Sequence, residues 1–88
     1  MIVEEEQTVD QKINEMESEL NKLIRQYELF FKRETKIEPL TARQTLQRRL
    51  MKLKTIHQRH TFKLGQIRQK FQTYSNLWDR QLQELLKS

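Results

Sequence analysis

Residues 46–78 read LQRRLMKLKTIHQRHTFKLGQIRQKFQTYSNLW. Apolar, aromatic or histidine side chains recur through this stretch in alternating steps of four and three residues, which is the heptad spacing of a helix that packs along one face. We call these positions the second stripe: Leu46, Leu50, Leu53, His57, His60, Leu64, Ile67, Phe71, Tyr74 and Trp78. The spacing predicts a long amphipathic helix.

A shorter heptad stripe precedes it in the chain. This first stripe consists of Val9, Ile13, Met16, Leu20, Leu23, Tyr27 and Phe30. When the chain is folded back on itself, the two stripes pair layer by layer, from Phe30 with Leu46 to Val9 with Ile67, as an antiparallel helical hairpin requires. Pro39 lies between the stripes and stops a helix from running through.

We therefore predict one all-α domain over residues 1–88, an antiparallel coiled-coil hairpin with a longer second helix. The first helix is expected at about 9–34, the turn at 35–41 and the second helix at about 42–87, with Thr41 and Gln44 as a capping box. The alternative is a three-helix bundle with a break near residues 55–61, where β-branched and histidine residues cluster.

The second stripe continues past the end of the first, so part of its apolar surface has no partner within the hairpin. The residues that we predict to form a partner interface lie in this surplus and on a wide apolar face of the first helix: Phe71, Tyr74, Trp78, Leu82, Leu85, Ile24, Leu29 and Phe31. Two helices bury only one stripe each. We therefore expect a homodimer with a four-helix arrangement, or docking onto a helical protein partner.

Charge is distributed unevenly along the chain, whose formal net charge is +5. Acidic residues are concentrated in residues 1–20, whereas no acidic residue lies between Glu38 and Asp79. In the hairpin, acidic flanks of the first helix would face basic flanks of the second. The basic flank could instead bind the phosphates of a nucleic acid or another polyanion. The candidate contacts are Arg43, Arg48, Arg49, Lys52, Lys54 and Arg59.

The sequence shows no glycine-rich phosphate loop, no nucleophile elbow and no HExxH zinc motif. His57 and His60 have a spacing that can chelate a metal, but both lie in the second stripe, so we interpret them as polar residues that control register. We expect no enzymatic activity, no cofactor, no metal and no small-molecule substrate. The predicted function is a protein–protein interaction or self-association module, and the alternative is polyanion binding through the second helix.

The cellular location is inferred from what the sequence lacks. No apolar run approaches the ~18 residues of a membrane-spanning helix, and the acidic N-terminal residues do not resemble a secretory signal. The sequence contains no cysteine, which fits a reducing compartment. We therefore expect a cytoplasmic protein without a membrane partner.

Several short motifs resemble a family of small uncharacterised helical domains from myxobacteria and related delta-proteobacteria. The residues that carry the resemblance are Tyr27, Glu28, Phe30, Phe31, Glu38, Pro39, Arg43, Leu46, Arg49, Leu50, Phe62, Phe71, Thr73, Tyr74, Trp78, Arg80 and Leu82. The similarity covers about residues 24–86, and Lys70 stands where the family has arginine. The resemblance implies a bacterial helical hairpin, and it implies no activity or ligand, because the family has none established.

Overall fold

The computed structural model describes residues 2–54 and 58–87 of the chain. These residues form three helices, α1 at Ile2–Phe31, α2 at Leu40–Lys52 and α3 at Gln58–Lys87, and no described residue lies in a strand. The all-α class is therefore confirmed. The molecule is elongated, with Cα extents of 54 × 19 × 15 Å.

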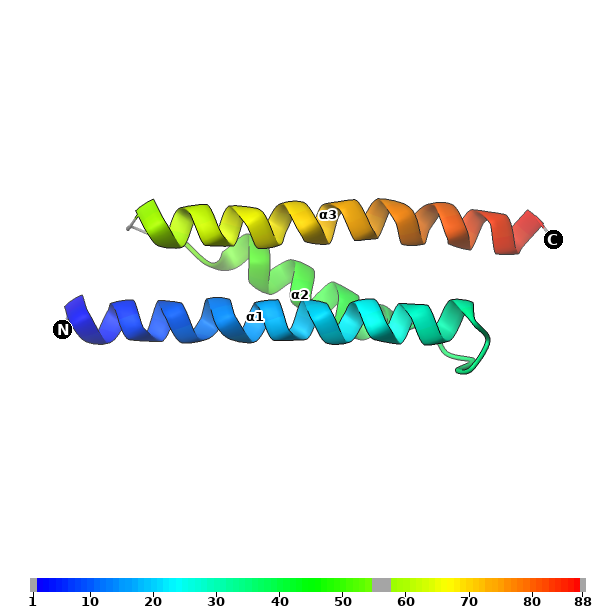
Figure 1. Ribbon diagram of the computed structural model, residues 1–88, viewed down its shortest axis with the longest axis horizontal. Coiled ribbons are helices and arrows are strands. Elements are labelled where there is room, and N and C mark those ends of the chain that lie inside the picture. Colours follow the sequence, from blue (N-terminus) through cyan, green and yellow to red (C-terminus); the bar gives the residue numbers. More distant parts are fainter. Residues whose placement is uncertain (1, 55–57, 88) are drawn as a thin grey trace.

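The two long helices lie side by side and run in the same direction, whereas the short α2 packs across them in the opposite direction (Figure 1). The turn after α1 and the C-terminus of the chain lie at one end of the bundle. We call this end the C-terminal end. At this end α1 stops, α2 begins and α3 reaches its own C-terminus.

The predicted long second helix is wrong, and the three-helix alternative is the arrangement that the chain adopts. The helix stops at Lys52, and Leu53 has extended backbone angles, φ −72° and ψ 121°. The break thus begins before the expected 55–61 segment, of which 55–57 lie outside the described residues. It also lets α3 turn back along α1, so that more of the second stripe packs against the first.

The first helix ends earlier than predicted, at Phe31 rather than near residue 34. Arg33 adopts a left-handed conformation with φ 64°. Its amide donates to the carbonyl of Phe30 at 3.0 Å, and the amide of Glu34 donates to the carbonyl of Leu29 at 2.9 Å. This pair of bonds is a Schellman motif, which satisfies carbonyls that the helix end would leave without partners.

The second helix begins at Leu40, directly after Pro39, and no side chain caps it. Thr41 therefore lies inside the first helical turn, and the predicted capping box is wrong. At the C-terminus of α2, a side chain of α3 binds the free carbonyl oxygens. The guanidinium of Arg68 donates to the carbonyl oxygens of Leu50 at 2.7 Å and Leu53 at 3.0 Å.

Both stripes supply the core, as their heptad spacing predicts. The buried stripe residues are Ile13, Met16, Leu20, Leu23 and Tyr27, together with Leu46, Leu50, His60, Leu64, Ile67, Phe71 and Trp78. Val9, Phe30, Leu53 and Tyr74 are partly buried against them. The predicted stripe position His57 lies outside the described residues.

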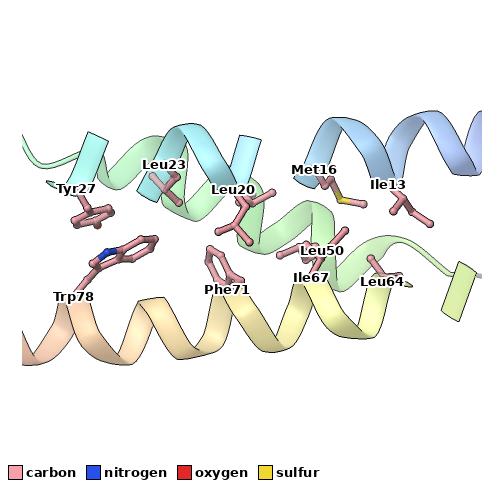
Figure 2. Close-up of a cluster of buried hydrophobic side chains, with 11 residues drawn as sticks. Ile13, Met16, Leu20, Leu23, Tyr27, Leu50, Leu64, Ile67, Phe71 and Trp78 are labelled. Carbon is pink, nitrogen blue, oxygen red and sulfur yellow. The ribbon is translucent and has the colours of Figure 1, made fainter. Parts of the chain in front are cut away.

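The layers that the stripes form differ from the predicted ones. Leu20 lies near Phe71, and Tyr27 lies against Trp78 (Figure 2). The hairpin would have placed Tyr27 opposite Leu50. Because α1 and α3 are parallel, successive layers advance in the same direction along both stripes. In the predicted hairpin they would have advanced in opposite directions.

Candidate interaction surface

An aromatic stack joins α1 and α3 near the C-terminal end. The ring centroids of Tyr27 and Trp78 lie 4.0 Å apart with an interplanar angle of 10°, and Phe71 meets Trp78 edge to face at 6.5 Å (Figure 2). Trp78 is only 2% exposed. The prediction that Phe71 and Trp78 form a partner interface is therefore wrong, because the parallel helices bring Tyr27 opposite Trp78 and make both residues part of the core.

Arg43 of α2 covers the edge of this stack. Its guanidinium carbon lies 5.5 Å from the Trp78 ring centroid and 5.9 Å from that of Tyr27, within the range of cation–π attraction. Its Nη2 donates to Asp79 Oδ1 at 2.8 Å and to the carbonyl oxygen of Ser75 at 3.3 Å. The side chain is 14% exposed, so Arg43 holds α2 against α3.

The Tyr27 hydroxyl completes the polar contacts, since it donates to Glu38 Oε2 at 2.7 Å and accepts from Arg43 Nη1 at 3.5 Å. Burial, followed by the hydrogen bond to Glu38, raises the pKa of Tyr27 to about 12, although Arg43 acts to lower it. Burial acts to lower the pKa of Arg43, but its hydrogen bonds to Tyr27 and Asp79 outweigh burial and raise it. We call Tyr27, Glu38, Arg43, Asp79 and Trp78 the Arg43 network.

The members of this network lie in separate stretches of the sequence, and no sequence pattern connected them. Tyr27, Glu38, Arg43 and Trp78 all appear among the motifs of the family resemblance, but only the fold brings them together. A signal was present at Tyr27. A tyrosine in a buried heptad position usually needs a hydrogen-bond partner for its hydroxyl.

The basic residues predicted to bind a polyanion divide into two groups. Arg43 belongs to the network, Arg49 donates to Glu19 and, at 3.3 Å, to Glu15, and Arg59 lies 3.6 Å from Asp10. The acidic face of α1 therefore pairs with basic residues of both other helices, as the charge pattern predicts. The exposed candidates are Arg48, Lys52 and Lys54.

An apolar hollow of about 260 Å³ lies between α1 and α3 near the C-terminal end. We call it the hollow, and it is lined by Ile24, Glu28, Phe31, Lys32, Tyr74, Leu77, Trp78 and Gln81. No residue of α2 contributes to this lining. Farther toward the start of α1, hydrogen bonds from Lys63 to Asn14 at 2.8 Å and from Lys70 to Asn21 at 3.3 Å join α3 to α1.

The remaining predicted interface residues relate differently to the hollow. Ile24, Phe31 and Tyr74 line it, whereas Leu29 and Leu82 are partly buried and do not. Leu85 is 38% exposed on the last turns of α3.

The sequence reasoning missed Leu77, which is 41% exposed and lines the hollow. It also missed the polar rim residues Glu28, Lys32 and Gln81. A signal existed in the spacing, because Leu77 lies three residues after Tyr74 and four before Gln81, so the three share one helix face.

The predicted polar position His60 is buried, and its Nε2 lies 2.7 Å from Asp10 Oδ1. In the described ranges, no group of three or more histidine, cysteine, aspartate or glutamate residues could hold a metal ion. None of the described helices combines the length and apolar character needed to cross a membrane.

The chain matches no protein-family model, no curated protein and no solved structure. The resemblance to the bacterial helical family therefore stays a prediction.

Proposed function

We propose that this chain is a non-enzymatic protein-interaction module that self-associates through the hollow. The observation that supports the proposal is an apolar surface between α1 and α3 to which no residue of α2 contributes. Apolar hollows with a polar rim are typical of protein–protein contacts.

The energetic reason is the partial burial of the side chains that line the hollow. Ile24, Phe31 and Tyr74 are only partly buried within one chain. Burying a whole leucine stabilises a structure by about 1.5–3 kcal/mol, so covering the half-exposed Leu77 contributes about 1 kcal/mol per protomer. Because the described residues of each protomer form three helices, the proposed dimer contains six helices where the sequence predicted four.

Sedimentation equilibrium tests self-association. We expect the mass to rise above the 10.9 kDa of one chain across a series from about 1 μM to 1 mM. Leu77→Lys places a charge in the hollow and should keep the chain monomeric. Phe62→Lys is the matched control, because Phe62 is 68% exposed on the same helix and does not line the hollow. A mass of one chain at every concentration would contradict the proposal.

The alternative function, polyanion binding, has one observation in its favour. A second, separate depression is lined by Lys12, Arg49 and Lys52 beside Leu53. Arg48 and Lys54 are exposed and lie close to these residues in the sequence. Binding to duplex DNA should then weaken steeply as salt rises, and Lys52→Glu should weaken it further. No binding at low salt would exclude this function.

We propose a bacterial, cytoplasmic setting for the module. The family resemblance supports the first and the lack of cysteine the second, since thiol-free chains need no oxidising compartment. Detection of the native protein in the particle-free cytoplasmic fraction of bacterial cells would test the location.

A further inference from the structure

The rim of the hollow carries one acid and one base, one helical turn apart. Glu28 and Lys32 are both exposed and both line the hollow. The amide of Lys32 donates to the carbonyl of Glu28 at 3.0 Å, so Lys32 continues the last turn of α1. Among the described residues, neither side chain belongs to an ion pair. Such a rim is complementary to its own copy after a two-fold rotation.

Helix α3, opposite this rim, carries two exposed leucines, of which Leu77 lines the hollow and Leu85 lies two turns farther along the helix. Leu77 is 41% exposed and Leu85 is 38% exposed. Gln81, which lines the hollow, stands four residues from each of them. Steps of four residues keep these three side chains on one face of a helix, so the leucines flank Gln81 symmetrically.

The stack of Tyr27 on Trp78 shows which residues of α1 and α3 lie at the same height along the bundle. Both helices run in the same direction (Figure 1), and both rise by ~1.5 Å per residue. Phe30 follows Tyr27 by three residues, and Gln81 follows Trp78 by three residues. Phe30 and Gln81 therefore lie at the same height along the bundle.

This shared height is the midpoint of the charged pair on α1 and of the leucine pair on α3. Glu28 and Lys32 lie two residues before and after the α1 position at this height. Leu77 and Leu85 lie four residues before and after the α3 position at the same height. A single two-fold axis perpendicular to the helices at this height therefore exchanges the members of both pairs, and self-complementarity of charge coincides with self-complementarity of shape.

We propose that a second copy of this chain covers the hollow about this axis, with the two α1 helices antiparallel and the two α3 helices antiparallel. Glu28 then pairs with the partner's Lys32, and Leu77 packs against the partner's Leu85. The inference rests on the proposed self-association and adds its geometry.

Cysteine cross-linking tests the position of the axis. The chain contains no cysteine, so Gln81→Cys introduces a single thiol, and a residue beside a two-fold axis meets its own copy within disulfide range. We expect a disulfide-linked dimer under mild oxidation. Gln83→Cys is the matched control, because Gln83 is exposed on the opposite face of the same helix turn, and it should remain unlinked. Equal linking of both variants, or none of Gln81→Cys, would overturn the proposed axis.

Charge exchange tests the proposed ion pairs independently. Glu28→Lys and Lys32→Glu should each raise the dimer dissociation constant about tenfold, because each creates two like-charge contacts across the axis. The double variant should restore the constant of the unchanged chain. Lys22→Glu is the control for the change in net charge, since Lys22 is exposed on α1 and does not line the hollow.

The outcomes separate the geometry from the function. A chain that dimerises, yet shows neither Gln81→Cys linking nor charge rescue, would overturn this arrangement while self-association stands. A chain that stays monomeric at every concentration would overturn both. Linking of Gln81→Cys together with charge rescue would support both.

Discussion

Tyr27 combines two roles that a leucine at the same heptad position could not combine. Its ring stacks on Trp78 inside the core, and its hydroxyl reaches Glu38 in the turn before α2. Arg43 then joins the hydroxyl to Asp79 of α3 through its own hydrogen bonds. One buried tyrosine thus connects the core to a polar network that spans all three helices.

The first prediction concerns the pH dependence of the Tyr27 contact. Folding raises the pKa of Tyr27 from 10.0 to about 12, so the fold favours the neutral phenol. The stability that this provides is fully present below pH 10 and is lost as the pH rises toward 12. In urea titrations over this range, Tyr27→Phe should lose less stability than the unchanged chain.

Tyr27→Phe should also lower the free energy of unfolding at pH 7 by about 1–2 kcal/mol, because it removes a hydrogen bond to a carboxylate. Tyr74→Phe is the control, since it removes the other of the two tyrosine hydroxyls and leaves the Arg43 network intact. An identical alkaline loss of stability in the unchanged chain and Tyr27→Phe would show that Tyr27 is not its cause.

At the scale of single elements, the ends of the helices decide the topology. The Schellman motif stops α1 at Phe31, and the extended Leu53 stops α2 at Lys52. Arg68 then binds the carbonyl oxygens at the end of α2, where a positive charge also complements the helix dipole. These ends turn two long stripes into three helices.

The second prediction concerns Arg33, the left-handed residue of the Schellman motif. A side chain at φ 64° costs about 1 kcal/mol relative to glycine. Arg33→Gly should therefore raise the free energy of unfolding by up to about 1 kcal/mol, as measured by chemical denaturation. Arg25→Gly is the control on the same helix, and it should lower the stability by about 1 kcal/mol because glycine is unfavourable inside a helix. A loss of stability in Arg33→Gly would contradict the assigned role of the turn.

At the scale of the whole molecule, the direction of pairing was the least predictable feature. Two stripes with the same alternation of steps form regular layers whether the helices run antiparallel or parallel. The pairs Leu20 with Phe71 and Tyr27 with Trp78 keep one constant separation in sequence, as regular as the layers expected for the hairpin. Periodicity alone could not choose between them.

The third prediction distinguishes the two directions in solution. In the three-helix arrangement, Lys70 reaches Asn21 at 3.3 Å, whereas the hairpin would have placed Asn21 near residue 55. Asn21→Cys/Lys70→Cys should therefore be joined within one chain by a short bis-maleimide, and peptide mass spectrometry would locate the link. Asn21→Cys/Gln72→Cys should link poorly, because Gln72 follows Lys70 by two residues on α3 and therefore does not share its helix face. Failure of the first pair to link would favour the hairpin.

The candidate surface was predicted only in part. Ile24 and Phe31 could be selected because apolar residues beyond a strict heptad stripe widen a helix face. Tyr74 could be selected because the second stripe continues past the end of the first, and all three residues line the hollow. Trp78 was misassigned because its partner, Tyr27, was expected to face Leu50. Arg43 was assigned to a polyanion because its anionic partner Asp79 lies 36 residues away in the sequence.

The sequence by itself determined the helical class and most of the core, since heptad spacing of apolar residues dictates which side of each helix is buried. It also determined the interruption near Pro39, because proline cannot continue a helix. Only the tertiary structure decided that α3 runs parallel to α1, that Arg43 is enclosed, and that the hollow remains open. The physical reason is that periodicity specifies a face, whereas the partner of that face depends on where the chain turns and on which side chains then meet across the helices.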